Sequence, residues 1–205
     1  MEIKEVRSLI DGIEIETRAD GAESRTISGY GIVFDKWSSD LGWFKEIVRA
    51  ESVNGEALKG DIIATFNHNF DQVMARTAAK SLTLKTDKRG VKYSFEAPNT
   101  TAGNDLLENI RIGNIRGSSF TFTVKKDRWT FSQKEGEPDE REILELGKVF
   151  ELGPVVMPAY PDTTAAKRSR ETVIEAEKKS DPTPSKNAIR ARVQGQKFKL
   201  IRKKG

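Results

Sequence analysis

A serine on a strand-like stretch is the best candidate for a nucleophile in this sequence. Ser119 lies in RGSSFTFTV, residues 116–124, where polar and apolar side chains alternate as they do along a β-strand. The apolar side chains of one face are Phe120, Phe122 and Val124. If that face is buried, Ser119 opens outward at the start of the strand, where a rigid element can present a hydroxyl. The alternative is that Ser119 only begins a polar strand face.

The single histidine is the leading candidate for a general base. His68 follows the apolar run IIATF, residues 62–66, so we expect it at a strand end or in the next loop. Imidazole is the side chain whose ordinary pKa suits proton transfer near neutral pH. A serine nucleophile needs such a base within hydrogen-bond reach, and the base needs an orienting partner. The alternative is a surface or hydrogen-bonded histidine without a catalytic role.

A carboxylate is one of the groups that can orient this base. With no second histidine in the chain, the partner is a carboxylate, an amide, a backbone carbonyl or a water molecule. Glu151 interrupts an otherwise apolar run, residues 149–157, and is therefore a candidate. It is equally consistent with an ordinary outward-facing strand residue.

The elements that must position these residues are mostly short strands. One convincing helix begins near residue 102, with Thr100 or Thr101 as its N-cap and Gly113 as its stop. A short helix is also expected at residues 51–59. The expected strands are residues 25–34, 43–48, 62–66, 74–76, 82–85, 91–96, 118–124, 129–131, 141–146 and 148–156, besides a weakly alternating stretch in residues 1–18. The pattern predicts a mostly β, α+β protein: a small closed or nearly closed β-barrel flanked by a few helices.

Composition excludes several kinds of site. The chain has 205 residues, no cysteine and one histidine, which excludes disulfides, thiolate metal sites, cysteine nucleophiles and multi-histidine zinc sites. We therefore expect no cofactor. The sequence contains neither an apolar run of about 20 residues nor a signal-peptide core, so we expect a soluble, intracellular protein.

Charge divides the chain into an acidic body and a basic tail. The net charge of +4 combines about −5 for residues 1–166 with +9 for residues 167–205. We expect a folded domain at residues 1–164. Residues 165–205 are expected to form a charged, flexible tail: a frayed helix at 165–179, the linker SDPTPS at 180–185 and a basic end.

Four segments in this order resemble the prohead (capsid maturation) proteases of tailed bacteriophages, which are distantly related to the herpesvirus assemblins. They are RTISGYGIVFDKWSSDLGWFKE (25–46), FNHNFDQVMART (66–77), TAGNDLLENIRIGNIRGSSFTF (101–122) and FELGPVVMPAYPDT (150–163). The resemblance implies a serine endopeptidase on a small β-barrel, with His68 as base. The family pattern Gly-x-Ser-Phe-Gly-Phe, aligned on Gly117, implies Ser119 as nucleophile. The pattern Glu-x-x-Pro-Val implies Glu151 as third member. Thr121 departs from the pattern, since a glycine is common there.

The resemblance also implies substrates and a place of action. The substrates would be the scaffold protein or the scaffolding-like region of the major capsid protein, cut inside the prohead in the host cytoplasm. Self-cleavage and self-association within the prohead are further expectations, and the basic tail would target the enzyme into the shell or be removed.

Two other classes of function stay open. The first is a non-enzymatic assembly protein that keeps the fold and binds capsid subunits. The second is a nucleic-acid-binding module that works through the basic tail, although that tail carries Phe198 as its one aromatic residue and no recognition fold is evident.

Overall fold

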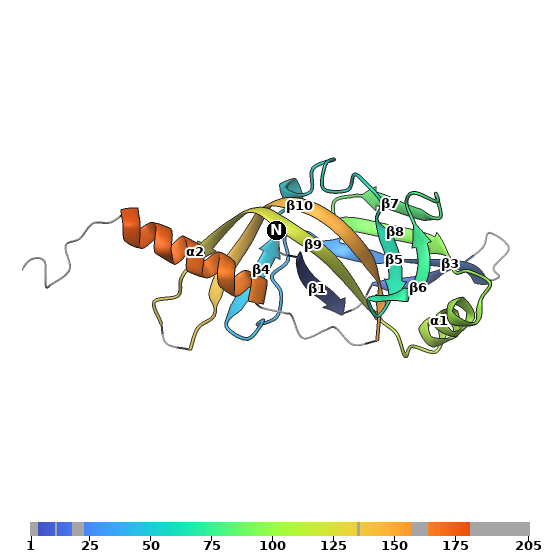
Figure 1. Ribbon diagram of the computed structural model, residues 1–205. Helices are drawn as coiled ribbons and strands as arrows, with labels where there is room; N and C mark the ends of the chain where they lie inside the picture. Colours follow the sequence, from blue (N-terminus) through green and yellow to red (C-terminus); the bar gives the residue numbers. More distant parts are fainter. Residues whose placement is uncertain (1–3, 11, 18–22, 135, 157–163, 181–205) are drawn as a thin grey trace, which may run out of the picture. The chain divides into compact units, whose positions relative to one another are not determined.

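The computed structural model describes residues 4–10, 12–17, 23–134, 136–156 and 164–180 (Figure 1). The chain divides into two compact units, residues 1–167 and 168–205, and each is described by itself. The predicted boundary at residues 164/165 stays a prediction. The predicted domain-closing segment 157–162 and the basic end of the tail lie outside the described residues.

Two β-sheets make up the first unit. The larger sheet has the strand order β1 (Lys4–Ile10), β9 (Gly117–Thr130), β10 (Asp139–Val155), β5 (Ile63–Phe66) and β6 (Asn69–Arg76), and β4 (Phe44–Val48) pairs with β10 as its sixth strand. The smaller sheet has the order β2 (Ile13–Thr17), β3 (Glu23–Val33), β8 (Gly90–Glu96) and β7 (Leu82–Thr86).

The mostly β, α+β class is confirmed, but the barrel is not supported. Within the described ranges neither sheet closes on itself: β1 and β6 end the larger sheet, and β2 and β7 end the smaller one. The strands instead pair as two separate sheets with a shared apolar core, and this arrangement buries apolar faces without a barrel. Alternation and strand count therefore identified the class, whereas closure depends on pairings that they do not encode.

The core is formed by aromatic and aliphatic side chains from both sheets. Phe120 and Phe122 are buried with their ring centroids 4.6 Å apart, as the alternation of the stretch predicts. They belong to the same buried cluster as Ile27 of β3 and Leu152 of β10. Each fully buried side chain of this size contributes about 1.5–3 kcal/mol, so this face firmly fixes which way β9 presents its other residues.

The strand β10 is longer than expected. The sequence predicts two strands, 141–146 and 148–156, whereas the structure has a single strand with several register shifts against β9. At one shift the amide of Lys148 donates to Thr123 Oγ1 at 3.0 Å rather than to a backbone carbonyl. Bulges of this kind bend a strand without ending it, and in Figure 1 β9 and β10 run beside each other as two long curved ribbons.

The helix in the first unit matches its prediction. Helix α1 spans Thr101–Arg111, and Thr100 is its N-cap, accepting a hydrogen bond from Gly103 N at 3.2 Å. Gly113 follows the helix with a φ of +80°, which glycine adopts without strain.

The prediction of a short helix at residues 51–59 is wrong. Only a 3₁₀ turn, η1 (Ala50–Ser52), forms there. The side chain of Asn54 accepts hydrogen bonds from the amides of Glu56 and Ala57, at 3.1 and 3.2 Å. Asparagine therefore holds a local turn in competition with the helix.

A buried ionic cluster holds β1, which the sequence did not predict as a separate strand, against the larger sheet. Its members are Glu5 and Arg7 of β1, Glu46 of β4, Asp127 of β9 and Arg141 of β10. Arg7 donates to Glu46 at 2.9 Å and to Glu5 at 2.7 Å, and Arg141 reaches Asp127 at 2.7 Å. Burial acts to lower the pKa of Arg141, but hydrogen bonding to Glu5 and the nearby carboxylates outweigh it and raise that pKa. Arg141 therefore keeps its positive charge within the buried cluster.

The helix expected at residues 165–179 is present as α2 (Thr164–Ser180). Neither described helix is long and apolar enough to cross a membrane.

Candidate active site

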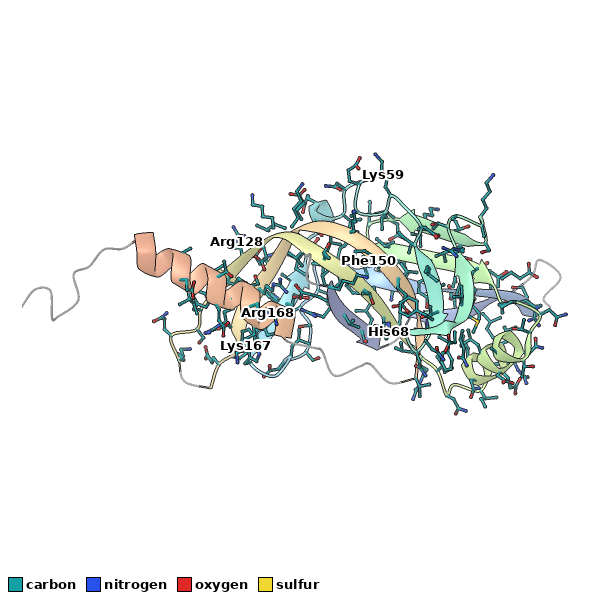
Figure 2. All side chains as sticks on the ribbon, viewed as in Figure 1. Lys59, His68, Arg128, Phe150, Lys167 and Arg168 are labelled. Carbon is teal, nitrogen blue, oxygen red and sulfur yellow. The ribbon has the colours of Figure 1, made fainter. Side chains whose placement is uncertain are left out.

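The turn between β5 and β6 presents His68. Asn67 and His68 form this two-residue turn, and both have left-handed backbones with φ of 54° and 58°, as two-residue hairpin turns often require. The location at a strand end is as predicted, and Figure 2 labels His68 there. A left-handed histidine costs about 1–3 kcal/mol, so surrounding contacts must hold it.

Contacts from the end of β10 supply that support. Asn67 N donates to Pro154 O at 3.0 Å, and Val156 N donates to Asn67 Oδ1 at 2.9 Å. The turn is thus tied to the end of the strand that carries Glu151, and His68 is fixed relative to it.

Glu151 contacts the edge of the histidine ring. His68 Nδ1 is 2.6 Å from Glu151 Oε2. Glu151 is 2% exposed, so it is not the outward-facing strand residue that the sequence left open. Cross-strand pairing explains its place, because Glu151 pairs with Ile63 of β5 on one side and with Thr121 of β9 on the other.

Two threonines complete the hydrogen bonding of this carboxylate. Thr65 Oγ1 donates to Glu151 Oε1, and Thr121 Oγ1 donates to Oε2 at 3.0 Å. Burial acts to raise the pKa of Glu151. The hydrogen bonds from His68 and Thr65, the charge of His68 and the bond from Thr121 outweigh it, so the pKa lies below its ordinary value. Glu151 is therefore a carboxylate at neutral pH.

This carboxylate fixes the tautomer of His68. An ionised carboxylate only accepts hydrogen bonds, so its geometry assigns the ring proton to Nδ1 and leaves the lone pair of a neutral ring on Nε2. Nε2 is buried and has no hydrogen-bond partner among the described residues. A neutral ring in this tautomer can accept a hydrogen bond or a proton at Nε2.

Ser119 lies on the same strand face as the carboxylate's partner Thr121. The two residues are separated by two positions along β9, about 7 Å in an extended strand. The directly opposite residue on β10 is Gly153, which has no side chain to intervene. The strand pairing thus brings Ser119 to the region of the His68–Glu151 pair.

The expectation that Ser119 opens outward is wrong in this structure. Its exposure is 0%, because β1 pairs with β9 from Lys4↔Thr123 to Ile10↔Gly117. Ser119 Oγ donates to Arg7 O at 2.9 Å and accepts from Ser8 Oγ at 3.0 Å. It makes no hydrogen bond to His68 Nε2, which has no partner in the described part of the chain.

The neighbouring Ser118 faces the core. Its hydroxyl lies 2.9 Å from the Tyr93 hydroxyl in a fully buried pair. Burial raises the pKa of Tyr93, and the bond to Ser118 lowers it by less. Ser118 is thus a buried hydrogen-bond partner on the face opposite Ser119.

Sequence reasoning missed several residues that shape this site. Thr65 was treated only as part of an apolar strand. A hydroxyl within the apolar run IIATF was nevertheless a signal for a buried hydrogen-bond donor. Asn67 carried a turn signal, since asparagine tolerates left-handed backbone. Ser8 and Arg7 had no signal, because their role depends on the pairing of β1 with β9.

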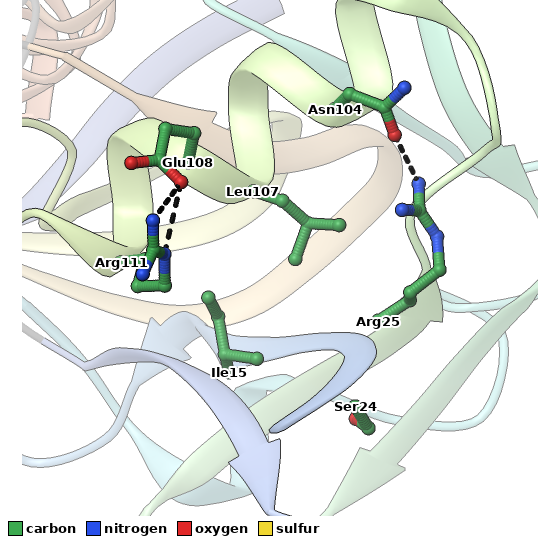
Figure 3. A pocket seen from close by; sticks show the side chains of 7 residues that line it. All are labelled: Ile15, Ser24, Arg25, Asn104, Leu107, Glu108 and Arg111. Atoms are coloured by element: carbon green, nitrogen blue, oxygen red, sulfur yellow. Dashed lines mark hydrogen bonds and ion pairs between the residues drawn. The ribbon is translucent and has the colours of Figure 1, made fainter. Parts of the chain in front are cut away.

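The cavity in Figure 3 lies elsewhere. It measures about 280 Å³ and lies between β2, β3 and α1, lined by Ile15, Ser24, Arg25, Asn104, Leu107, Glu108 and Arg111. Arg25 donates to Asn104 Oδ1 at 2.8 Å and to the carbonyl of Ala97, and Arg111 pairs with Glu108. Its charged groups thus have polar partners, and none of the lining residues belongs to the His68–Glu151 pair.

Comparison with known proteins identifies the family. The family model for the Caudovirus prohead serine protease matches residues 13–179. No curated protein matches the chain. Among solved structures, the chain is similar to the bacteriophage T4 capsid assembly protease, gp21, at 14% identity and a TM-score of 0.39, over 74% of this chain and 98% of that one. Because the family match spans well over half of the sequence and confirms the predicted resemblance, this chain belongs to the Caudovirus prohead serine protease family.

Proposed function

We propose that this chain is the endopeptidase that cuts capsid-assembly proteins inside the prohead, with Ser119 as nucleophile, His68 as general base and Glu151 as the group that orients the base. The observation that carries the proposal is the 2.6 Å contact between His68 Nδ1 and Glu151, with Nε2 buried and without a partner among the described residues. A carboxylate-held imidazole whose second nitrogen is available is the arrangement that activates a serine hydroxyl.

Acyl transfer follows from these roles. Ser119 Oγ attacks the carbonyl carbon of a peptide bond while His68 Nε2 takes its proton, and the carboxylate of Glu151 stabilises the imidazolium that forms. The C–N bond then breaks, the proton passes from His68 to the leaving amine, and water releases the acyl group by the reverse sequence. Backbone amides stabilise the oxyanion during both steps.

The two threonines support this chemistry by holding Glu151. Because Thr65 and Thr121 each donate to one carboxylate oxygen, the carboxylate keeps its orientation at the edge of the ring. Its lowered pKa keeps it charged at neutral pH, so it favours the imidazolium rather than sharing the proton.

The substrates we propose are the scaffold protein or the scaffolding-like region of the major capsid protein. Membership of a prohead protease family supports this class of substrate, and it also supports a reaction within the prohead, in the host cytoplasm. Self-cleavage belongs to the same proposal.

Co-expression with the cognate major capsid protein tests the proposal. Mass spectrometry of the capsid protein should show a shortened product with the wild-type chain and the full-length mass with Ser119→Ala. The matched control is Ser118→Ala, which removes the adjacent hydroxyl from the opposite face of β9 and should leave much of the cleavage. Equal cleavage by wild type and Ser119→Ala would reassign the nucleophile.

A non-enzymatic assembly protein is the second candidate, and the burial of Ser119 under β1 favours it. In that case the chain binds capsid subunits without cutting them. The capsid protein would keep its full mass in the presence of folded wild-type chain that has entered the particle, and a serine-directed phosphonate would leave that chain unlabelled.

A further inference from the structure

We propose that the edge of β9 from Gly117 to Thr123 is a binding site for an extended peptide, and that the chain's own strand β1 fills this site until a substrate strand replaces it. The proposal rests on the proposed function, because it names where the substrate of Ser119 binds. It adds that the nucleophile is closed off by a segment of the same chain.

The contacts of Ser119 carry the proposal. Its hydroxyl donates to the backbone carbonyl of Arg7 at 2.9 Å, which is the kind of group that a protease nucleophile meets in its substrate. The contact is unproductive, because the proton is directed at the carbonyl oxygen and not at His68. Ser8 Oγ donates to Ser119 Oγ at 3.0 Å and occupies one of its lone pairs. A segment that binds like a substrate and also occupies the hydrogen bonds of the Ser119 hydroxyl keeps the site inactive.

The pairing of β1 with β9 has the form of strand addition. Seven consecutive residue pairs, from Lys4↔Thr123 to Ile10↔Gly117, join the two strands antiparallel without a register shift. Extended peptides bind exposed sheet edges in this way, with backbone hydrogen bonds that suit many sequences. An incoming substrate strand can therefore make the same backbone contacts that β1 gives up.

The side chains of β1 make it a replaceable strand. Its two buried side chains among the described positions are the charged residues Glu5 and Arg7, whereas Val6, Ser8 and Leu9 are only half-buried. Burial of apolar surface thus contributes little to its attachment. Ionised groups regain hydration when they leave a protein interior, which offsets much of the lost pairing energy.

The ionic cluster remains paired when β1 leaves. Glu5 and Arg7 carry opposite charges, so their removal does not change the net charge of the cluster. Arg141 still contacts Glu46 at 2.9 Å and Asp127 at 2.7 Å. When β1 departs, no buried cation is therefore left without a partner in this cluster, and the rest of the sheet can stay folded.

The family match agrees with a separable β1. It begins at residue 13, after the last residue of β1, and contains β9, β10 and the turn that bears His68. The elements that carry the proposed catalytic residues thus lie within the matched residues, and β1 lies outside them.

A reversible disulfide that locks β1 in place tests the proposal on the full chain. Lys4 and Thr123 are directly paired, so Lys4→Cys combined with Thr123→Cys places two sulfurs within bonding distance. The natural chain has no cysteine, so this bond is the only one that can form. The matched control is Thr83→Cys with Ser94→Cys, a directly paired position between β7 and β8 in the other sheet.

The first readout is strand exchange and does not require catalysis. A fluorescent peptide with the sequence of residues 4–10, KEVRSLI, is added to the oxidised and the reduced protein. We expect the reduced protein to bind it at least about tenfold more tightly than the oxidised one, because binding requires β1 to leave. The β7–β8 control should bind equally in both redox states. Equal affinity in the locked and unlocked β1 variants, or no binding to either, would overturn the strand site.

The second readout connects the strand site to Ser119. Labelling of Ser119 by a fluorophosphonate, mapped by mass spectrometry, should be at least about tenfold slower in the oxidised β1 variant than in the reduced one. Equal rates would overturn the inhibitory role of β1. Redox-dependent peptide binding without labelling of Ser119 in any form would instead contradict the proposed catalytic function and leave the strand site standing, so the two failures are distinguishable.

Discussion

At the scale of single residues, the site depends on how one carboxylate is held. The sequence singled out His68, Ser119 and Glu151, and the structure brings two of them, His68 and Glu151, into direct contact. The sequence could not indicate that Thr65 and Thr121 would donate to the carboxylate, because these contacts depend on the registers of β5, β9 and β10. Nor could alternation alone show that Ser119 lies beneath another strand.

The stability of the fold should depend on pH through Glu151. Its folded pKa lies below the ordinary value of 4.5, so its charge stabilises the fold above that pH, and the contribution is lost as pH falls through the lowered folded pKa. Glu151→Gln should therefore cost about 1–3 kcal/mol at pH 7 and progressively less below pH 4.5. Urea unfolding at pH 7 and pH 3 measures this. A difference between wild type and variant that stays constant across this range would contradict the ionised, hydrogen-bonded carboxylate.

The hydroxyl of Thr121 should support catalysis without being essential. Thr121→Val keeps the shape of the side chain but removes the 3.0 Å hydrogen bond to Glu151 Oε2. We expect a fall of about three- to thirtyfold in kcat, the equivalent of about 0.7–2 kcal/mol for one hydrogen bond to a charged group, with little change in KM. Thr83→Val, at an exposed position in the other sheet, is the control. A variant with wild-type kcat would remove Thr121 from the positioning of Glu151.

At the scale of elements, strand identity was predictable and strand pairing was not. Strand-like patterns located β3, β5, β8 and both ends of β9, which the structure joins into one strand, and Thr100 and Gly113 marked the ends of α1. The joining of two expected strands into β10 depends on bulges, and the covering of β9 by β1 depends on charges far apart in sequence. These features arise from tertiary contacts, which local patterns do not contain.

The close approach of β5 to β10 should be essential for the position of His68. A Cβ at Gly153 would lie 2.2 Å from the carbonyl oxygen of Thr65, which is too close for any atom pair that is not bonded. Gly153→Ala must therefore push β5 and its turn away from Glu151. We expect a large loss of cleavage and a lower midpoint of thermal unfolding, measured on the same samples.

Gly55→Ala is the matched control for this change, since a Cβ at Gly55 meets no atom within 4 Å. It should leave both properties near wild type. Wild-type cleavage by Gly153→Ala would show that the β5–β10 contact does not set the catalytic geometry.

At the scale of the whole molecule, we expect the acidic body and the basic tail to have separate roles. The first compact unit ends at Lys167, and the proposed catalytic residues all lie within it. The sequence predicts a division at residues 164/165 from composition and charge, and both this boundary and the role of the tail stay predictions, since residues 181–205 lie outside the described structure.

Removal of residues 181–205 should separate folding from targeting. A chain that ends at Ser180 keeps both described helices, so we expect an unchanged unfolding midpoint and unchanged phosphonate labelling. Its incorporation into proheads should fall at least about tenfold if the tail supplies the attraction to the shell. Incorporation measured by quantitative mass spectrometry at wild-type level would assign targeting to the body.

The nucleic-acid alternative can be tested with the same truncated chain. If the tail binds nucleic acid through phosphate contacts, filter binding by the full chain should weaken steeply between 50 and 200 mM salt, on the order of 10³-fold or more. The truncated chain should then bind hardly at all. We expect weak binding by both, because the proposed catalytic residues all lie within residues 1–167.

The most direct test is to map where a serine-directed phosphonate attaches to the wild-type chain in an assembled, cleaving sample. We expect one adduct, on the Ser119 hydroxyl, that is absent from Ser119→Ala and strongly reduced in His68→Ala. An adduct on any other residue, or continued cleavage of the capsid protein by Ser119→Ala, would contradict this assignment of the nucleophile.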